Sequence, residues 1–301
     1  MGPTASGKTT LAIELSQRLP VEIISVDSAL IYRDMNIGTA KPTPDILRQI
    51  PHRLIDIRDP SQIYSAGEFY QDAVSAIENI IKKKRLPLLV GGTMFYFRVL
   101  QQGISMLPQT DHVVRQRLRQ ELQQQGIKKL YERLTLLDPH GTQRIHPNDS
   151  QRLLRALETI EITNKTLIEL QQSSLPVPPS YRFINIALVP TDRKDHRAHI
   201  VNRFQAMLRQ GFIEEVKNLF QRSDLHTELP AIRTVGYRQI WDHLAKKLTF
   251  AAMQERAIIA TCQVAKRQTT WLRSWKNLFI FPNDTDNQLS KIIDLIQANL
   301  E

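Results

Sequence analysis

The feature that most constrains this chain is a short run at its start, which reads Gly2-Pro3-Thr4-Ala5-Ser6-Gly7-Lys8-Thr9. It fits the pattern G-x-x-x-x-G-K-[ST] without a mismatch, and it opens an amphipathic helical pattern. The glycines let consecutive backbone N–H groups converge on one anion, Lys8 adds a positive charge, and the Thr9 hydroxyl can bind Mg²⁺. The positive end of the following helix points to the same place. These eight residues therefore predict a diphosphate-binding loop.

Such a loop normally follows a strand, but only Met1 precedes Gly2. Two explanations are open: a start upstream of Met1, or a shortened chain with a weakened sheet. We favour the first, because the other parts of the predicted site are intact.

Short apolar runs alternate with helical patterns in the first hundred residues, as in parallel α/β proteins. Strands are predicted at residues 21–26, 53–57 and 86–90, and a strand at 183–189 is expected to return to the same sheet. Helical patterns occupy residues 9–19, 66–82, 111–125 and 150–162, a loop is predicted at 173–179, and helices are expected from 190 onward. The predicted fold class is α/β, with a P-loop NTPase-like parallel sheet core (residues 1–108 and 183–301, helical toward the C-terminus) and a helical insertion domain at 109–182.

Composition excludes several classes of protein. No apolar run approaches the ~18 residues that span a bilayer, and no signal peptide is present, so we expect a cytoplasmic protein with no membrane contact. The single cysteine, Cys262, excludes an intrachain disulfide and a Cys-rich zinc site, and core packing is favoured for it over reactivity. The eight histidines include no pair at metal-ligand spacing.

The net charge of +10 is uneven, because residues 233–276 hold nine basic and two acidic side chains. A cationic stretch suits a polyanion such as RNA, and a solvated helix face is the alternative. Trp271 and Trp275, four residues apart, could stack on RNA, although core packing is favoured.

The loop at residues 2–9 alone does not identify the reaction, because ATP is only the commonest of the molecules that carry a diphosphate. Asp27, at the end of the predicted strand 21–26, could be the metal-ligating acid of a nucleotide hydrolase. No guanine-reading motif or nucleoside clamp is visible. A small-molecule kinase therefore stays open at this point.

Longer motifs favour one family. In order along the chain they are Asp27-Ser28-Ala29-Leu30-Ile31-Tyr32-Arg33, Asn36-Ile37-Gly38-Thr39-Ala40-Lys41-Pro42, Leu89-Val90-Gly91-Gly92-Thr93-Met94-Phe95-Tyr96, Arg144-Ile145-His146-Pro147-Asn148-Asp149, Gln151-Arg152-Leu153-Leu154-Arg155-Ala156-Leu157-Glu158, Ile232-Arg233-Thr234-Val235-Gly236-Tyr237-Arg238-Gln239 and Ala265-Lys266-Arg267-Gln268. Together with the P-loop, this set resembles the tRNA dimethylallyltransferases, also called tRNA isopentenyltransferases. The absence of a C-terminal zinc finger resembles the bacterial type.

The resemblance implies transfer of a dimethylallyl group from dimethylallyl diphosphate to N6 of the adenine 3′ to the anticodon, in tRNAs that read codons beginning with U. It implies Mg²⁺ as the cofactor, the tRNA anticodon stem-loop as the partner, and a monomer. Asp27 matches the general base and Thr93 a channel residue near the bridging oxygen. The tRNA-contacting positions that it implies are Asp27, Ser28, Ala29, Leu30, Arg115, Gln151, Arg152, Leu153, Leu154, Arg155, Arg203, Arg233, Thr234, Val235, Gly236, Tyr237 and Arg238.

Alternatives accompany these assignments. Asp27 could be a metal ligand, Thr93 a turn or helix cap, and residues 151–155 a solvated basic helix. Helical spacing places Gln151 and Arg155 one turn apart and lets Leu153 and Leu154 face the core. Besides the kinase, a non-catalytic RNA-binding protein switched by nucleotide is a rival. A kinase would turn over ATP without RNA, and a switch would leave the RNA covalently unchanged.

Overall fold

The computed structural model describes residues 1–104, 108, 111–173, 180–283 and 287–300. The chain forms two compact units. Unit 1 comprises Met1–Gln101 and Pro179–Glu301, and unit 2 comprises Gln102–Pro178. The boundaries of unit 2 lie several residues from those expected for the insertion, 109–182. No helix among the described residues is long and apolar enough to cross a membrane.

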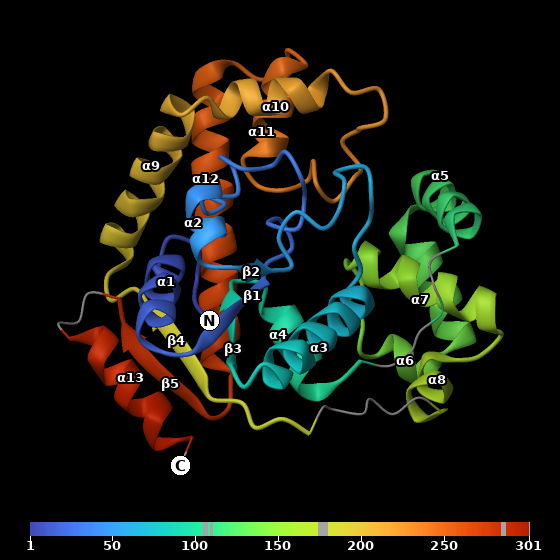
Figure 1. The fold of residues 1–301 in the computed structure, drawn as a ribbon. Helices are drawn as coiled ribbons and strands as arrows, with labels where there is room; N and C mark the ends of the chain where they lie inside the picture. Colours follow the sequence, from blue (N-terminus) through green and yellow to red (C-terminus); the bar gives the residue numbers. More distant parts are fainter. Residues whose placement is uncertain (105–107, 109–110, 174–179, 284–286, 301) are drawn as a thin grey trace. The chain divides into compact units, whose positions relative to one another are not determined.

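Unit 1 contains two parallel sheets (Figure 1). The first has the order β2-β1-β3, and the second pairs β4 with β5. In register, Val21 lies opposite Leu86 and Asn185 opposite Leu278. The strands are β1 (Val21–Val26), β2 (His52–Arg53), β3 (Leu86–Gly91), β4 (Asn185–Val189) and β5 (Leu278–Pro282).

The central strand β1 is buried along its whole length, which explains its nearly continuous apolar sequence. Its one charged residue is Glu22, which binds Arg53 at 3.0 Å and Lys83 at 3.1 Å. Burial raises the pKa of Glu22, but the hydrogen bonds from these two cations outweigh that effect and leave the pKa lowered. The carboxylate is therefore ionised and paired at neutral pH.

Two strand predictions need correction, and one further strand was not expected. The strand expected at 53–57 is limited to β2, because Leu54 and Asp56 have φ of 62° and 57°, which end an extended run. The strand expected at 183–189 begins at Asn185 and pairs with β5, not with the first sheet. Strand β5 itself was missed, although its sequence Leu-Phe-Ile-Phe-Pro is a short apolar run of the kind that forms buried strands.

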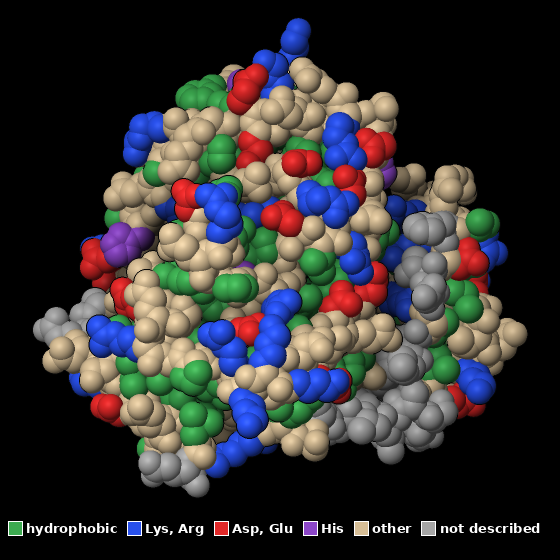
Figure 2. Space-filling model, viewed as in Figure 1, with side chains coloured by type: hydrophobic (Ala, Val, Ile, Leu, Met, Phe, Trp, Pro, Cys, Tyr) green, Lys and Arg blue, Asp and Glu red, His purple; other side chains and the backbone are tan. Residues whose placement is uncertain are grey.

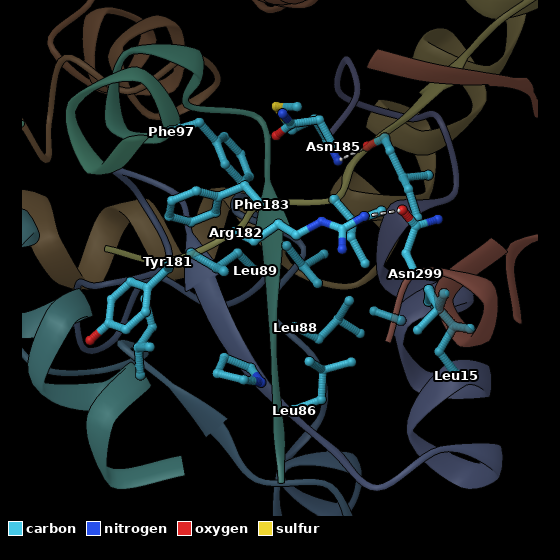
Figure 3. A pocket seen from close by; sticks show the side chains of 18 of the residues that line it. Leu15, Leu86, Leu88, Leu89, Phe97, Tyr181, Arg182, Phe183, Asn185 and Asn299 are labelled. Carbon is cyan, nitrogen blue, oxygen red and sulfur yellow. Dashed lines mark hydrogen bonds between the residues drawn. The ribbon is translucent and has the colours of Figure 1, made fainter. Parts of the chain in front are cut away.

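An apolar cavity of 510 Å³ lies between the edges of β3 and β4 (Figure 3). Leu86, Leu88 and Leu89 of β3 line it, together with Phe97 and Phe183. At its polar side Gln101 donates a 2.6 Å hydrogen bond to Asn185, and Arg182 donates a 2.9 Å bond to Asn299. Of the residues predicted to form the functional site, this cavity is lined only by Lys8.

Helices cover the sheets of unit 1. Helix α3 contacts β1 and β3, whereas α1 contacts β1, β3 and α13. The long helix α12 contacts α9 and α11. The helices of unit 1 are α1 (Lys8–Arg18), α2 (Pro44–Gln49), α3 (Ala66–Lys82), α4 (Met94–Gln102, whose last residue is the first of unit 2), α9 (Arg193–Arg209), α10 (Phe212–Phe220), α11 (Tyr237–Leu244), α12 (Phe250–Arg273) and α13 (Gln288–Ala298).

The side chains for which the sequence allowed either a packing or a functional role are partly buried. Trp271 and Trp275 are partly buried against the main hydrophobic cluster, which supports the packing interpretation. The Arg98 guanidinium also lies 5.8 Å from the Trp271 ring centroid. Cys262 is half-buried and free.

Unit 2 is helical in its described residues, with α5 (His112–Leu137), α6 (Pro139–Thr142), α7 (Ser150–Thr163) and α8 (Leu167–Ser173). The expected helix 111–125 continues to Leu137, with a break at Gly126, whose φ is 78°. Helix α7 begins where expected, and the Asp149 carboxylate accepts a 3.0 Å bond from Arg152 N–H. The predicted loop at 173–179 lies outside the described residues, apart from Ser173, which ends α8.

Candidate functional site

The predicted phosphate loop turns sharply into α1. Ala5 has φ of 59° and Gly7 φ of 84°, a left-handed backbone that glycine adopts most easily. Gly7 is the N-cap of α1, and no side chain caps the first amides of the helix. Those unbonded N–H groups and the positive helix end together suit an anion.

Contacts from distant segments hold this loop in place. Met1 donates to Ile186 O at 2.7 Å and accepts from Leu188 N–H at 2.9 Å, so Met1 pairs with β4 as a strand residue would. Gly2 lies so close to β4 that a Cβ there would be 2.6 Å from Leu188 O. Pairing with β4 therefore supports the backbone at the entry of the loop.

Two side chains form hydrogen bonds with the backbone of Thr4, in the middle of the loop. Gln268 Oε1, on α12, accepts a 2.8 Å bond from Thr4 N–H, and Gln268 Nε2 donates to Gly92 O at 2.9 Å. His196 Nε2, on α9, lies 2.8 Å from Thr4 O and donates to it in the tautomer with a proton on that nitrogen. Gln268 thus connects the phosphate loop to the turn after β3.

Lys8 is the main charge at the loop. Its Nζ donates a 2.5 Å bond to Pro3 O. Burial lowers the pKa of Lys8 to about 8, Asp27 opposes this shift, and Arg203 adds to it. Lys8 is therefore cationic at pH 7 and close to titration.

Asp27 and Thr93 meet beside the loop. Asp27 follows β1, and its Oδ1 accepts bonds from Ala29 N–H at 2.8 Å and Leu30 N–H at 3.3 Å. Thr93 Oγ1 accepts from Ser28 N–H at 3.1 Å, so both side chains organise the same turn. Gly91 permits this close approach, since a Cβ there would lie 1.9 Å from Val26 O.

Three cavities border the phosphate loop, and Arg203 of α9 lines all three. The first, of 810 Å³, is bordered by residues 5–10, 36–37 and 40–44. The second, of only 100 Å³, contains Lys8, Thr9 and Asp27. The third, of 550 Å³, is lined by residues 27–29, Thr93 and 233–236. We refer to them as the loop, central and outer cavities.

The structure thus brings most predicted residues of unit 1 together. Arg233 and Arg238 are exposed and available to a partner. Tyr237, by contrast, is fully buried, and its hydroxyl donates to Glu215. The expectation that the Tyr237 side chain contacts tRNA is therefore corrected to a packing role.

The predicted residues of unit 2 lie on α5 and α7. Gln151 and Arg152 are exposed on the first turn of α7. Leu153 and Leu154 are buried in the core of the unit, so direct contact of these two side chains with tRNA is also corrected. Arg155 is half-buried and bonds Glu158 and Pro108 O, at 3.1 and 2.6 Å. Arg115, on α5, has an interaction partner within the chain.

Some side chains at the site were not given a role from sequence. Gln268 and Lys41 stand within quoted motifs, but nothing in their spacing shows which backbone groups they bind. His196 and Glu215 carry no local signal at all. Their partners are about 180–190 residues away in the chain, a pairing that sequence periodicity does not reveal.

The central cavity offers the donors that a hard divalent cation prefers. Thr9, Asp27 and Ser25 all contribute oxygen atoms to its lining. The Ser25 hydroxyl is buried and has no hydrogen-bond partner among the described residues. A buried hydroxyl without a partner is costly, so a bound ion's water or a diphosphate oxygen would fit here.

The fold and these cavities define an α/β protein with an anion cradle beside a carboxylate. A family model described as IPP transferase matches residues 30–275. A tRNA dimethylallyltransferase of Coxiella burnetii is 49% identical over 298 residues, which cover 99% of each chain.

Solved structures agree. The tRNA isopentenylpyrophosphate transferase of Bacillus halodurans is 32% identical, with a TM-score of 0.73, over 99% of this chain and 94% of that one. A eukaryotic dimethylallyltransferase acting on tRNA, at 24% identity, shares the fold with a TM-score of 0.83, over 99% of this chain and 77% of that one. The chain belongs to the IPP transferase family, and the resemblance inferred from its motifs is confirmed.

Proposed function

We propose that this protein transfers the dimethylallyl group of dimethylallyl diphosphate to N6 of the adenine 3′ to the anticodon, in tRNAs that read codons beginning with U. The observation that carries the proposal is the placement of Asp27. It lines both the central cavity, beside Lys8 and Thr9, and the outer cavity, which is large enough for a base. A carboxylate at this junction can face the diphosphate on one side and an acceptor on the other.

The reaction breaks the bond between C1 of the dimethylallyl group and the diphosphate oxygen, and forms a bond from C1 to N6. Negative charge grows on the departing diphosphate, where the amides of residues 2–9 and the Lys8 ammonium stabilise it. Asp27 accepts the proton that N6 loses. Thr93, whose Oγ1 accepts from Ser28 N–H, would turn its hydroxyl proton toward the bridging oxygen when the diphosphate is bound.

Mg²⁺, held through Thr9 with Asp27 nearby, would supply further neutralisation of the diphosphate when bound. The core is proposed to be P-loop NTPase-like, with the loop repurposed for a prenyl diphosphate. The family relatives are named as transferases acting on tRNA, so the kinase alternative finds no support.

The target adenine is proposed to be extruded from the anticodon loop into the outer cavity, where residues 27–29 and 233–236 would surround it. Unit 2, with Gln151 and Arg152 exposed on α7, is proposed as a further tRNA contact. On the face in Figure 2, Lys and Arg side chains are interspersed with Asp and Glu. Affinity is therefore proposed to rest on particular cations, such as Arg233 and Arg238.

The direct test is incubation with labelled dimethylallyl diphosphate and unmodified tRNA, followed by nucleoside analysis. We expect label in N6-(dimethylallyl)adenosine. A matched tRNA with guanine in place of the target adenine should stay unlabelled, because guanine lacks the N6 amine. ATP consumption without RNA, and no labelled nucleoside, would contradict the proposal.

The pH dependence of catalysis should reflect the protonation state of Lys8. Because its pKa is lowered to about 8, the cation predominates below pH 8 and is lost above it. We expect kcat/KM for dimethylallyl diphosphate to fall about tenfold per pH unit above about pH 8, since this ratio reports groups of the free enzyme. The Lys8→Arg variant, which stays charged, should lack this decline; the same decline in both proteins would assign it to another group.

Binding of tRNA should weaken steeply with salt. If about four phosphates are neutralised, raising salt from about 50 to 200 mM should lower the affinity about 50-fold through counterion release. The Arg238→Ala variant should show a shallower salt dependence. A flat response in the wild-type protein would exclude these phosphate contacts.

A further inference from the structure

The segment of residues 36–42, which we call the bordering loop, contributes to all three site cavities. Asn36 and Lys41 line the loop cavity, Pro42 the loop and central cavities, and Gly38 the outer cavity. Thr39 lines the central and outer cavities. The position of this loop therefore sets the width of the whole site.

One carboxylate holds the start of the bordering loop. Glu215, on α10, accepts backbone N–H bonds from Asn36 at 2.8 Å, Ile37 at 2.7 Å and Gly38 at 3.1 Å. It also accepts the Tyr237 hydroxyl at 2.6 Å. Four donors thus converge on two oxygens that only accept, an arrangement that requires the ionised carboxylate.

The surroundings confine this contact to one geometry. Burial, and then the Glu215 charge, raise the pKa of Tyr237 far above its usual value, so its hydroxyl remains a donor. A Cβ at Gly38 would lie 2.1 Å from the Phe212 ring, so the backbone is pressed against α10. Little room is left for the loop to move toward Glu215.

A second anchor fixes the other end of the bordering loop. Lys41 Nζ donates to Tyr32 O and to Asn36 Oδ1, both at 2.8 Å, and to Asp56 at 2.5 Å. Lys41 lines the loop cavity itself, whereas Glu215 is absent from the described linings of all three site cavities. Glu215 therefore does not line the site itself, and acts on it through the groups that it binds, chiefly the three amides of the bordering loop.

We infer that Glu215 is a positioning residue that sets the bordering loop at the distance from the phosphate loop that seats the prenyl diphosphate. The inference rests on the proposed function for its identification of the ligand. It assigns no step of the chemistry to Glu215.

The test compares Glu215→Gln with Glu214→Gln in the full chain. Glu214 is its neighbour on α10, is exposed and pairs with Lys217, so it provides a matched control. The NH₂ group that Glu215→Gln introduces would face groups that are themselves hydrogen-bond donors, so some of the four bonds would be lost. We expect the KM for dimethylallyl diphosphate to rise about tenfold or more, with kcat within about threefold, because charge-assisted bonds that fix the loop are lost.

Two further readouts separate positioning from general instability. Hydrogen exchange at the amides of residues 36–38 should accelerate at least about tenfold in Glu215→Gln, and not in Glu214→Gln. Glu215→Asp retains the charge and should recover part of the lost affinity. If Glu215→Gln does not fold, Tyr237→Phe, which removes one of the four donors, should raise the KM about threefold.

A wild-type KM and wild-type exchange at residues 36–38 in Glu215→Gln would overturn the inference, as would an equal change in Glu214→Gln. Titration of each variant with inorganic pyrophosphate gives the same comparison without catalysis. If the unmodified protein and Glu214→Gln do not prenylate tRNA, the proposed function fails. The pyrophosphate and exchange results still decide the role of Glu215 in that case.

Discussion

Replacing Asp27 with asparagine is expected to lower kcat for prenyl transfer by about 10²–10⁴-fold, the usual contribution of a positioned general base. Asparagine keeps an oxygen that can accept from the Ala29 and Leu30 amides, so the turn after β1 should survive. Only the ability to take the N6 proton is removed. Single-turnover transfer to tRNA, measured at pH 7 or below so that Lys8 stays protonated, provides the test.

The matched control for this variant is Asp34→Asn. Asp34 is exposed in the same segment and has φ of 62°, a conformation that asparagine tolerates well. The Asp34→Asn variant should retain normal turnover. If Asp27→Asn also retains normal turnover, the base lies elsewhere. If Asp27→Asn loses affinity for pyrophosphate and keeps its turnover, the metal-ligand alternative for Asp27 is supported.

Truncating Lys8 to alanine is expected to raise the dissociation constant for dimethylallyl diphosphate by about 10–150-fold. This range corresponds to the loss of a charge-assisted hydrogen bond of about 1.5–3 kcal/mol. Because Lys8 is cationic at pH 7 and pays a desolvation cost in the free protein, the diphosphate is the natural partner for its charge. Equilibrium binding of inorganic pyrophosphate measures the effect without chemistry.

Lys82→Ala serves as the control, since Lys82 is exposed on α3 and outside the described lining of the site cavities. Its affinity for pyrophosphate should equal that of the unmodified protein. Equal affinity in Lys8→Ala would contradict the assignment of residues 2–9 as the cradle.

Local patterns in the sequence were enough to predict the elements around the phosphate loop. A mostly apolar run indicated β1, and a motif of fixed spacing indicated the loop and α1. The same local patterns failed for β2, where two residues with positive φ end the strand, and for β5, a short run within a long helical region. Pairing of β4 with β5, not with β3, is a long-range choice that periodicity does not encode.

The same difference between local and long-range information applies to the residues of the site. Lys8, Thr9, Asp27 and Thr93 could be named because each lies within a continuous motif. Glu215, Gln268 and His196 could not be given roles, since each binds backbone groups of a distant segment, and a backbone partner leaves no mark on the sequence. Leu153 and Leu154 belong to a segment that the resemblance assigned to tRNA contact, but their helical spacing favoured the core, where their side chains lie. A family motif does not separate packing from recognition.

The central claim is that the cradle binds a diphosphate that leaves from carbon, with no phosphoryl group passed on. The most direct measurement is the stoichiometry of one reaction containing tRNA, dimethylallyl diphosphate and ATP labelled at its γ-phosphate. We expect one pyrophosphate released for each N6-(dimethylallyl)adenosine formed, and no label transferred from ATP. Label from ATP on any acceptor, together with chemically unchanged tRNA, would contradict the claim.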